Sequence, residues 1–135
     1  MNDKITFKNV SLNLTAEALE YLCGTTAGTA NIIFFKDLLS RMTDTKTTVL
    51  KRGISIEIRP GQADASMLSM ARSWGVGRKV ALGIFTAMER HGIIRRNSDN
   101  ITSLIDMVCV SGWYADGYFH KNPLYTYASN PVSRP

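Results

Sequence analysis

The segment 66–96, SMLSMARSWGVGRKVALGIFTAMERHGIIRR, carries the clearest structural pattern in this chain of 135 residues. Ser66 predicts the start of a helix, because its hydroxyl can accept a hydrogen bond from a free N–H of the first turn. The apolar face of this short helix holds Met67, Leu68 and Ala71. The run Trp74-Gly75-Val76-Gly77 interrupts the helical period and predicts a tight turn, since glycine adopts positive φ at little cost.

A second helix is predicted to begin at Arg78. Its apolar residues Ala81, Phe85 and Met88 recur three and four positions apart. Gly92 follows the last of these periods and suits a helix C-terminus. Two helices joined by a glycine-bearing turn predict a helix-turn-helix, which can place its second helix in a DNA major groove.

Two further helices are expected upstream. Thr15 should cap a short helix, Ala16 to Cys23, with Leu19 and Leu22 directed inward. A longer helix is expected from about Thr29 to Met42, because a broad apolar stripe repeats at helical spacing. The stripe consists of Ile32, Phe35, Leu39 and Met42, widened by Ile33 and Leu38.

Two hairpins are predicted around the helical segment. Alternating isoleucines over Ile54–Arg59, preceded by Thr47–Lys51, favour a hairpin that turns at Arg52-Gly53. After the second helix, Ile93–Arg96 and Ile101–Val110 are expected to be strands joined by a tip at 97–100. A hairpin directly after a recognition helix is a wing.

These elements predict an α+β fold, a winged helix-turn-helix with three to four helices and a small antiparallel β-sheet. An N-terminal arm and short helix occupy 1–27, the winged-helix domain 28–110, and an aromatic strap with a flexible C-terminal tail 111–135. We expect the strap to be ordered but irregular, and the tail to be disordered from about Ser129. The strap is rich in aromatic residues: Trp113, Tyr114, Tyr118, Phe119, Tyr125 and Tyr127.

Positive charge is concentrated on the predicted helix-turn-helix and the start of the wing. The chain has a net charge of +5, and residues 66–100 hold six Lys/Arg against two Asp/Glu, a net of +4. A basic face favours a polyanionic partner, because neutralised phosphates release counterions. The alternative is a basic surface that is simply solvated.

Residues 66–94 resemble the winged helix-turn-helix of bacterial regulators and replication proteins. The typical pattern has Leu-Ala on the first helix, Leu-Gly-Val-Ser-Arg at the turn and Leu-Glu-x-x-Gly-Leu-Ile at the end of the second helix. This chain has Met70-Ala71, Trp74–Arg78 and Met88–Ile94 at those places. The lead-in Arg59-Pro60-Gly61-Gln62 resembles phage and plasmid replication modules, including the N-terminal domain of DnaD-like primosome proteins.

The resemblance implies a duplex-DNA-binding protein, either a transcription regulator or a replication-initiation component of a mobile element. No enzymatic activity is expected, because the acidic residues are scattered and no Ser/His/Asp arrangement or P-loop spacing occurs. The candidate DNA-binding residues are Arg72, Gly77, Arg78, Lys79, Val80, Leu82, Thr86, Arg95 and Arg96. Arg78 and Lys79 are the strong donors of the second helix. Arg95 or Arg96 would contact the flanking backbone, since alternate strand residues face opposite ways. Gly77 departs from the family, which usually has Ser or Thr there.

The outer face of the second helix leaves a second function open. Val80, Leu82, Gly83 and Thr86 are expected to point outward, and they offer few hydrogen bonds for reading base edges. The two aliphatic residues suit thymine methyl groups, or an apolar patch for a protein partner. The alternative is therefore a protein–protein interaction module that uses this face and the aromatic strap. The strap aromatics could otherwise stack on single-stranded bases, cover the core or form a homodimer contact.

Several other classes are not indicated. The chain has no apolar run of about 20 residues and no secretory h-region near its start, so we expect a cytoplasmic protein without a membrane contact. Cys23 and Cys109 both lie among apolar neighbours and favour buried reduced thiols, although a disulfide stays open. No metal, cofactor or small-molecule ligand is expected, because the histidines are isolated and no Cys/His cluster occurs.

Overall fold

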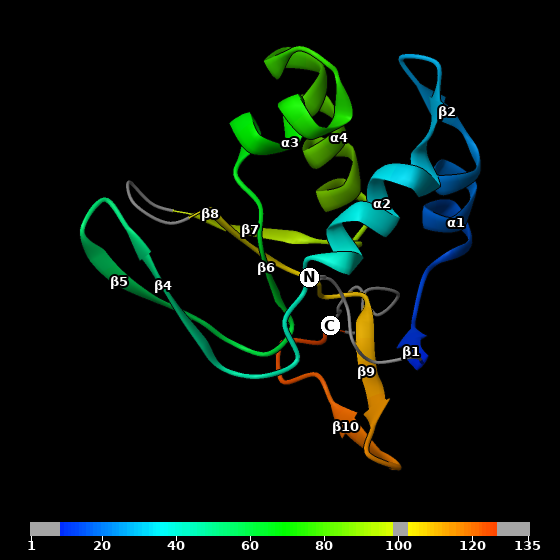
Figure 1. The fold of residues 1–135 in the computed structure, drawn as a ribbon. Helices are drawn as coiled ribbons and strands as arrows, with labels where there is room; N and C mark the ends of the chain where they lie inside the picture. Colours follow the sequence, from blue (N-terminus) through cyan, green and yellow to red (C-terminus); the bar gives the residue numbers. More distant parts are fainter. Residues whose placement is uncertain (1–8, 99–102, 127–135) are drawn as a thin grey trace, which may run out of the picture.

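Four helices and several small antiparallel sheets make up the computed structural model, which describes residues 9–98 and 103–126 (Figure 1). This confirms the α+β class. The helices are α1 Ala16–Cys23, α2 Asn31–Ser40, α3 Met67–Trp74 and α4 Arg78–Arg90. The strands are β1 Asn9–Leu12, β2 Thr25–Thr26, β3 Thr29–Ala30, β4 Thr47–Lys51, β5 Ile54–Ile58, β6 Gln62–Asp64, β7 Arg95–Ser98, β8 Ser103–Asp106, β9 Val110–Ala115 and β10 Tyr118–Lys121.

Local sequence signals explain where the helices begin. The hydroxyl of Thr15 accepts a hydrogen bond from the N–H of Ala18, and Ser66 accepts one from Ser69, so both predicted caps are confirmed. Each bond satisfies a first-turn donor that has no partner within the helix. At the other end of α3, Gly75 has φ 68°, the left-handed conformation that glycine adopts without a Cβ penalty.

A three-stranded sheet with the order β6-β8-β7 lies beside α3 and α4 (Figure 1). The chain runs α2, β6, α3, α4, β7, β8, with the β4–β5 hairpin inserted before β6. The first strand of the sheet therefore pairs with the last, and the strand that follows α4 lies at an edge.

The predicted hairpin over β4 and β5 is confirmed. Its register pairs Lys51 with Ile54, so Arg52 and Gly53 form a two-residue loop. Both loop residues have positive φ, 53° and 77°, as a type I′ turn requires. The primed turn matches the right-handed twist of the two strands.

One hydrophobic core includes residues from all three predicted segments of the chain. Leu22 from α1, Phe85 from α4 and Trp113 from β9 are each no more than 2% exposed and belong to the same cluster. The segments that flank the predicted winged-helix domain therefore contribute directly to its core.

Several predicted inward residues are exposed, and the reason is the rotational phase of each helix. In α1 the buried pair is Ala18 and Leu22, four residues apart, which turns Leu19 outward at 53% exposure. In α2 the core side is formed by Phe34, Phe35 and Leu38. Predicted core residues that this phase leaves exposed in α2 are Ile32 and Ile33, and Leu68 is exposed in α3.

The prediction of an irregular aromatic strap is wrong. Residues Val110–Ala115 and Tyr118–Lys121 form an antiparallel hairpin, and β1 completes a sheet with the order β1-β9-β10. The turn is Asp116-Gly117, with φ of 54° and 82°, a dipeptide that strongly favours two-residue hairpin loops. The predicted returning strand accordingly ends at Asp106, and Val110 starts a different sheet. The tail from Ser129 lies outside the described residues.

The two cysteines have different environments. Cys109 is buried and Cys23 is exposed, so the prediction that both are buried is wrong for Cys23. Neither thiol forms a disulfide in the structure. Burial raises the pKa of the Cys109 thiol to about 12, because the thiolate would lose its hydration inside the core.

Candidate nucleic-acid interface

The turn between α3 and α4 presents the two cationic residues expected to bind DNA. Gly77 caps α4 with its backbone in an extended conformation and without a side-chain hydrogen bond. Arg78 and Lys79 follow in the first turn of the helix, and both side chains are exposed. Among the described residues, neither forms an ion pair. Two cationic groups and the free N–H groups of a helix start therefore point to solvent together.

The faces of α4 are largely as predicted, with one correction. Ala81, Phe85 and Met88 are buried, whereas Leu82 is 42% exposed and Thr86 is exposed. Gly83 is also exposed, and a Cβ added there would meet no atom within 4 Å.

Val80 does not point outward as predicted; it packs against the core. The inner face of α4 is wider than predicted, because it also includes Ile84, which is 1% exposed and was not predicted to be buried. Val80 lies one turn before Ile84, so the two share a side of the helix. This widens the buried stripe and removes Val80 from the candidate contact surface.

Arg72 lies exposed in the last turn of α3. The C-terminal end of α3 is held by Trp74, whose indole N–H donates to the carboxylate of Asp37 in α2 at 2.7 Å. The Trp74 ring also packs against Phe34 and Phe85, with ring centroids 4.9 and 5.8 Å away. The predicted break of the helix at residues 74–77 is confirmed, since α3 ends at Trp74, and the indole also holds this end of α3 against the core.

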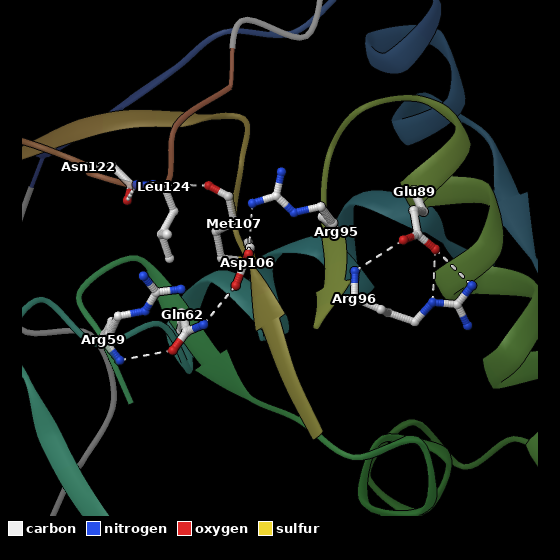
Figure 2. A network of polar contacts seen from close by, with 9 residues as sticks. All are labelled: Arg59, Gln62, Glu89, Arg95, Arg96, Asp106, Met107, Asn122 and Leu124. Atoms are coloured by element: carbon white, nitrogen blue, oxygen red, sulfur yellow. Dashed lines mark hydrogen bonds and ion pairs between the residues drawn. The ribbon is translucent and has the colours of Figure 1, made fainter. Parts of the chain in front are cut away.

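Arg95 forms an ion pair with a buried carboxylate, which Figure 2 shows from close by. Its Nη2 lies 2.9 Å from Oδ2 of Asp106, which is 1% exposed. The other carboxylate oxygen accepts a bond from Nε2 of Gln62 at 2.8 Å, and Gln62 accepts one from the N–H of Arg59. The Arg95 side chain is half exposed, so it neutralises a core charge and still reaches solvent.

Arg96 is held by the C-terminal part of α4. Its Nε lies 2.9 Å from Oε1 of Glu89, and its backbone N–H donates to Oε2 of the same carboxylate at 3.1 Å (Figure 2). Both side chains are only about one third exposed, at 29% and 34%. Glu89 thus connects β7 to α4.

Of the nine predicted contact residues, Val80 packs against the core, and Leu82 and Thr86 are exposed farther along α4. The other six residues form two groups. Arg72, Gly77, Arg78 and Lys79 lie in or beside the α3–α4 turn and are exposed. The two arginines of β7 are engaged in ion pairs with Asp106 and Glu89. Neither carboxylate was identified from the sequence.

The predicted hairpin tip at 97–100 is two residues too early. Ser98 pairs with Ser103, so β7 extends through Asn97 and Ser98. This register places Asp106 opposite Arg95, which explains their ion pair. Asp99 and Asn100, the rest of the predicted tip, lie outside the described residues.

The described part of the chain offers no group of three or more His, Cys, Asp or Glu residues that could hold a metal ion. Within the same residues, no helix is long and apolar enough to cross a membrane. Comparison with protein-family models, with curated proteins and with solved structures finds no match to this chain.

Proposed function

We propose that this chain is a winged helix-turn-helix protein that binds duplex DNA through the start of α4. The observation that carries the proposal is the exposed pair Arg78 and Lys79, which follows an open glycine cap and has no carboxylate partner among the described residues. In this mode the first turn of α4 approaches the major groove, and Arg72 contacts an adjacent phosphate.

The order of elements supports the winged-helix assignment. Apart from the inserted β4–β5 hairpin, the order from α2 onward is a helix, a strand, two helices and a hairpin, and this last hairpin pairs with the strand in the order β6-β8-β7. The hairpin formed by β7 and β8 corresponds to the wing, and α4 corresponds to the recognition helix.

The chemistry of α4 supports phosphate binding more than base reading. Between Lys79 and the last residue of α4, Arg90, the exposed positions carry Leu82, Gly83 and Thr86. These side chains supply a single hydrogen-bonding group, whereas direct readout relies on bidentate donors and acceptors. We therefore propose a binding mode with a large electrostatic component and limited sequence selectivity.

A salt titration tests the proposal. Binding of the protein to a labelled duplex of random sequence is measured by fluorescence anisotropy from about 50 mM salt upward. The wild type should bind and lose affinity steadily as the salt concentration rises. The double variant Arg78→Ala/Lys79→Ala should bind more weakly throughout. Absent binding at about 50 mM salt, or affinity that does not respond to salt, would refute the mechanism.

A matched control separates local contacts from overall charge. Lys36 on α2 and Arg90 at the far end of α4 are both exposed. The variant Lys36→Ala/Arg90→Ala changes the net charge by the same amount as the test variant. It should retain nearly wild-type affinity if binding is localised at the start of α4. Equal losses in both variants would indicate a diffuse field effect.

Two biological roles fit this proposal, a small transcription regulator and a replication-initiation component of a mobile element. The Arg59-Pro60-Gly61-Gln62 lead-in favours the second through its resemblance to replication modules. Selection of bound sites from random duplexes distinguishes a sequence-specific binder from a non-specific one. Neighbouring genes distinguish the pathway: replication and mobilisation genes for one role, a divergent operon for the other.

A protein-interaction module is the second candidate, and the exposure of Leu82 favours it. This leucine is 42% exposed beside Gly83, where a Cβ would meet open space. Under this alternative, Leu82→Asp abolishes binding of a protein partner, and Arg78→Ala/Lys79→Ala leaves it intact. The DNA-binding proposal expects Leu82→Asp to have the smaller effect on duplex affinity.

A further inference from the structure

The sheet β1-β9-β10 carries two exposed aromatic rings on one face. Tyr114 of β9 lies directly opposite Phe119 of β10, and their ring centroids are 5.0 Å apart. Tyr114 is 50% exposed and Phe119 is 43% exposed. Trp113, the next residue along β9, points to the opposite face, into the core, where it is 2% exposed.

The position of Phe119 depends on a glycine in the neighbouring strand. A Cβ built on Gly112 would lie 2.4 Å from Cζ of the Phe119 ring, closer than real Cβ contacts allow. The ring therefore lies across the backbone of Gly112, and its exposed surface is directed to solvent. Gly112 and Tyr114 share a face because they are two residues apart in the strand. The absence of a side chain at Gly112 gives the aromatic pair its place on the sheet.

The polar residues on the same face suit a nucleic acid. The strand register places Asn9 in the row of Tyr114 and Phe119, and Ser11 and Lys121 in the row of Gly112. Lys121 is exposed and forms no ion pair among the described residues. These two rows of the sheet contain no carboxylate. Aromatic rings, one cation and small hydrogen-bonding groups suit a ligand with unpaired bases and phosphates better than they suit a ligand with an aliphatic protein surface.

We propose that this face of the sheet β1-β9-β10 binds single-stranded nucleic acid, with Tyr114 and Phe119 stacking on bases and Lys121 contacting phosphate. This site is separate from the start of α4, because α3 and α4 lie at the top of Figure 1 and the β9–β10 hairpin lies at the bottom. The protein then has one surface for duplex and another for an unpaired strand.

The test uses a labelled single-stranded oligothymidylate of about 15 nucleotides, with binding measured by anisotropy. Tyr114→Ala/Phe119→Ala should lower the affinity at least about tenfold, because each lost stack removes a sizeable part of the binding energy. Tyr118→Ala is the matched control, since Tyr118 lies in the same hairpin, is 72% exposed and alternates to the other face. This control should bind like the wild type. Tyr114→Ala alone provides a milder variant that keeps Phe119 over Gly112.

Two further measurements keep this proposal distinct from duplex binding. Arg78→Ala/Lys79→Ala should weaken duplex binding and retain oligothymidylate binding, so each site can fail alone. The proposal is overturned if the wild type does not bind the oligothymidylate at about 50 mM salt. It is also overturned if both aromatic variants bind like the wild type. If light scattering shows that they alter the oligomeric state while oligothymidylate affinity is unchanged, the face is an interface between copies of the chain.

Discussion

Two pairs of adjacent cations look alike in the sequence but have different surroundings. Arg78 and Lys79 are exposed at the start of α4, and they have no ion-pair partner among the described residues. Arg95 and Arg96 of β7 are each bound to a carboxylate, one of them fully buried. Both pairs contribute equally to the positive charge of residues 66–100.

The difference shows that a count of charges does not measure how many cationic side chains are available to a ligand. The contact with the buried Asp106 occupies one N–H group of the Arg95 guanidinium and neutralises much of its charge, so Arg95 attracts a phosphate more weakly than an unpaired arginine does. The first-turn cations of α4 have no such contact to lose, and the positive end of the helix dipole makes their neighbourhood still more attractive to anions. These surroundings support the proposal that Arg78 and Lys79 bind the ligand and that Arg95 and Arg96 mainly stabilise the fold.

The largest expected effect is the loss of stability on Arg95→Ala. This variant leaves the carboxylate of Asp106 buried, with a single remaining bond from Gln62. We expect a loss of about 3 kcal/mol in the free energy of unfolding, the low end for a broken buried pair because Arg95 is half exposed. Chemical denaturation measures it.

Arg78→Ala is the matched control for that experiment. It removes the same side chain from an exposed helix position, where alanine is an excellent helix former. The change in unfolding free energy should stay within about 0.5 kcal/mol. Similar losses in the two variants would break the distinction between the basic pairs.

A smaller effect is expected for Glu89→Ala. The variant removes a partly exposed ion pair and the acceptor of the Arg96 N–H, which should cost about 1 kcal/mol of stability. It also releases Arg96, so the affinity of the folded protein for duplex should rise. Glu20→Ala, an equal change of charge at an exposed position of α1, is the control. A duplex affinity below that of the control would contradict the structural role of Glu89.

The smallest effect is expected for Gly77→Ser. Gly77 has φ −73° and ψ 164°, close to the values of the caps Thr15 and Ser66, and a Cβ there meets open space. A serine hydroxyl could therefore accept a bond from the first turn of α4. We expect the free energy of unfolding to rise by a few tenths of a kcal/mol, as measured by thermal or chemical denaturation. A lower stability would show that the start of α4 is not an ordinary uncapped helix end.

Features set by neighbouring residues were predictable from the sequence. The caps at Thr15 and Ser66 depend on a bond three residues away, and the hairpin at Arg52-Gly53 depends on a two-residue turn. The β9–β10 hairpin carried a similar signal in Asp116-Gly117, which the aromatic composition of the segment obscured. These features depend on residues that are close in the sequence and not on tertiary packing.

Features set by distant residues were not predictable. The ion pair of Arg95 depends on the β7–β8 register, which changes with the length of the loop. The burial of Val80 depends on how α4 is rotated against the core, and the period alone allowed Ile84 on either side of the boundary. Most exposed positions of α4 could thus be predicted from the sequence, but the sequence did not show that the cations of β7 are ion-paired while Arg78 and Lys79 are not.

The most direct test of the central claim compares the salt dependence of duplex binding after changes to the Arg78–Lys79 pair and to Arg96. The slope of the logarithm of the affinity against the logarithm of the salt concentration reports the number of phosphates neutralised. Arg78→Ala/Lys79→Ala should reduce this slope by about 2, and Arg96→Ala by less than about 0.5. A reduction that is equal for both variants, or larger for Arg96→Ala, would contradict the assignment of DNA binding to the start of α4.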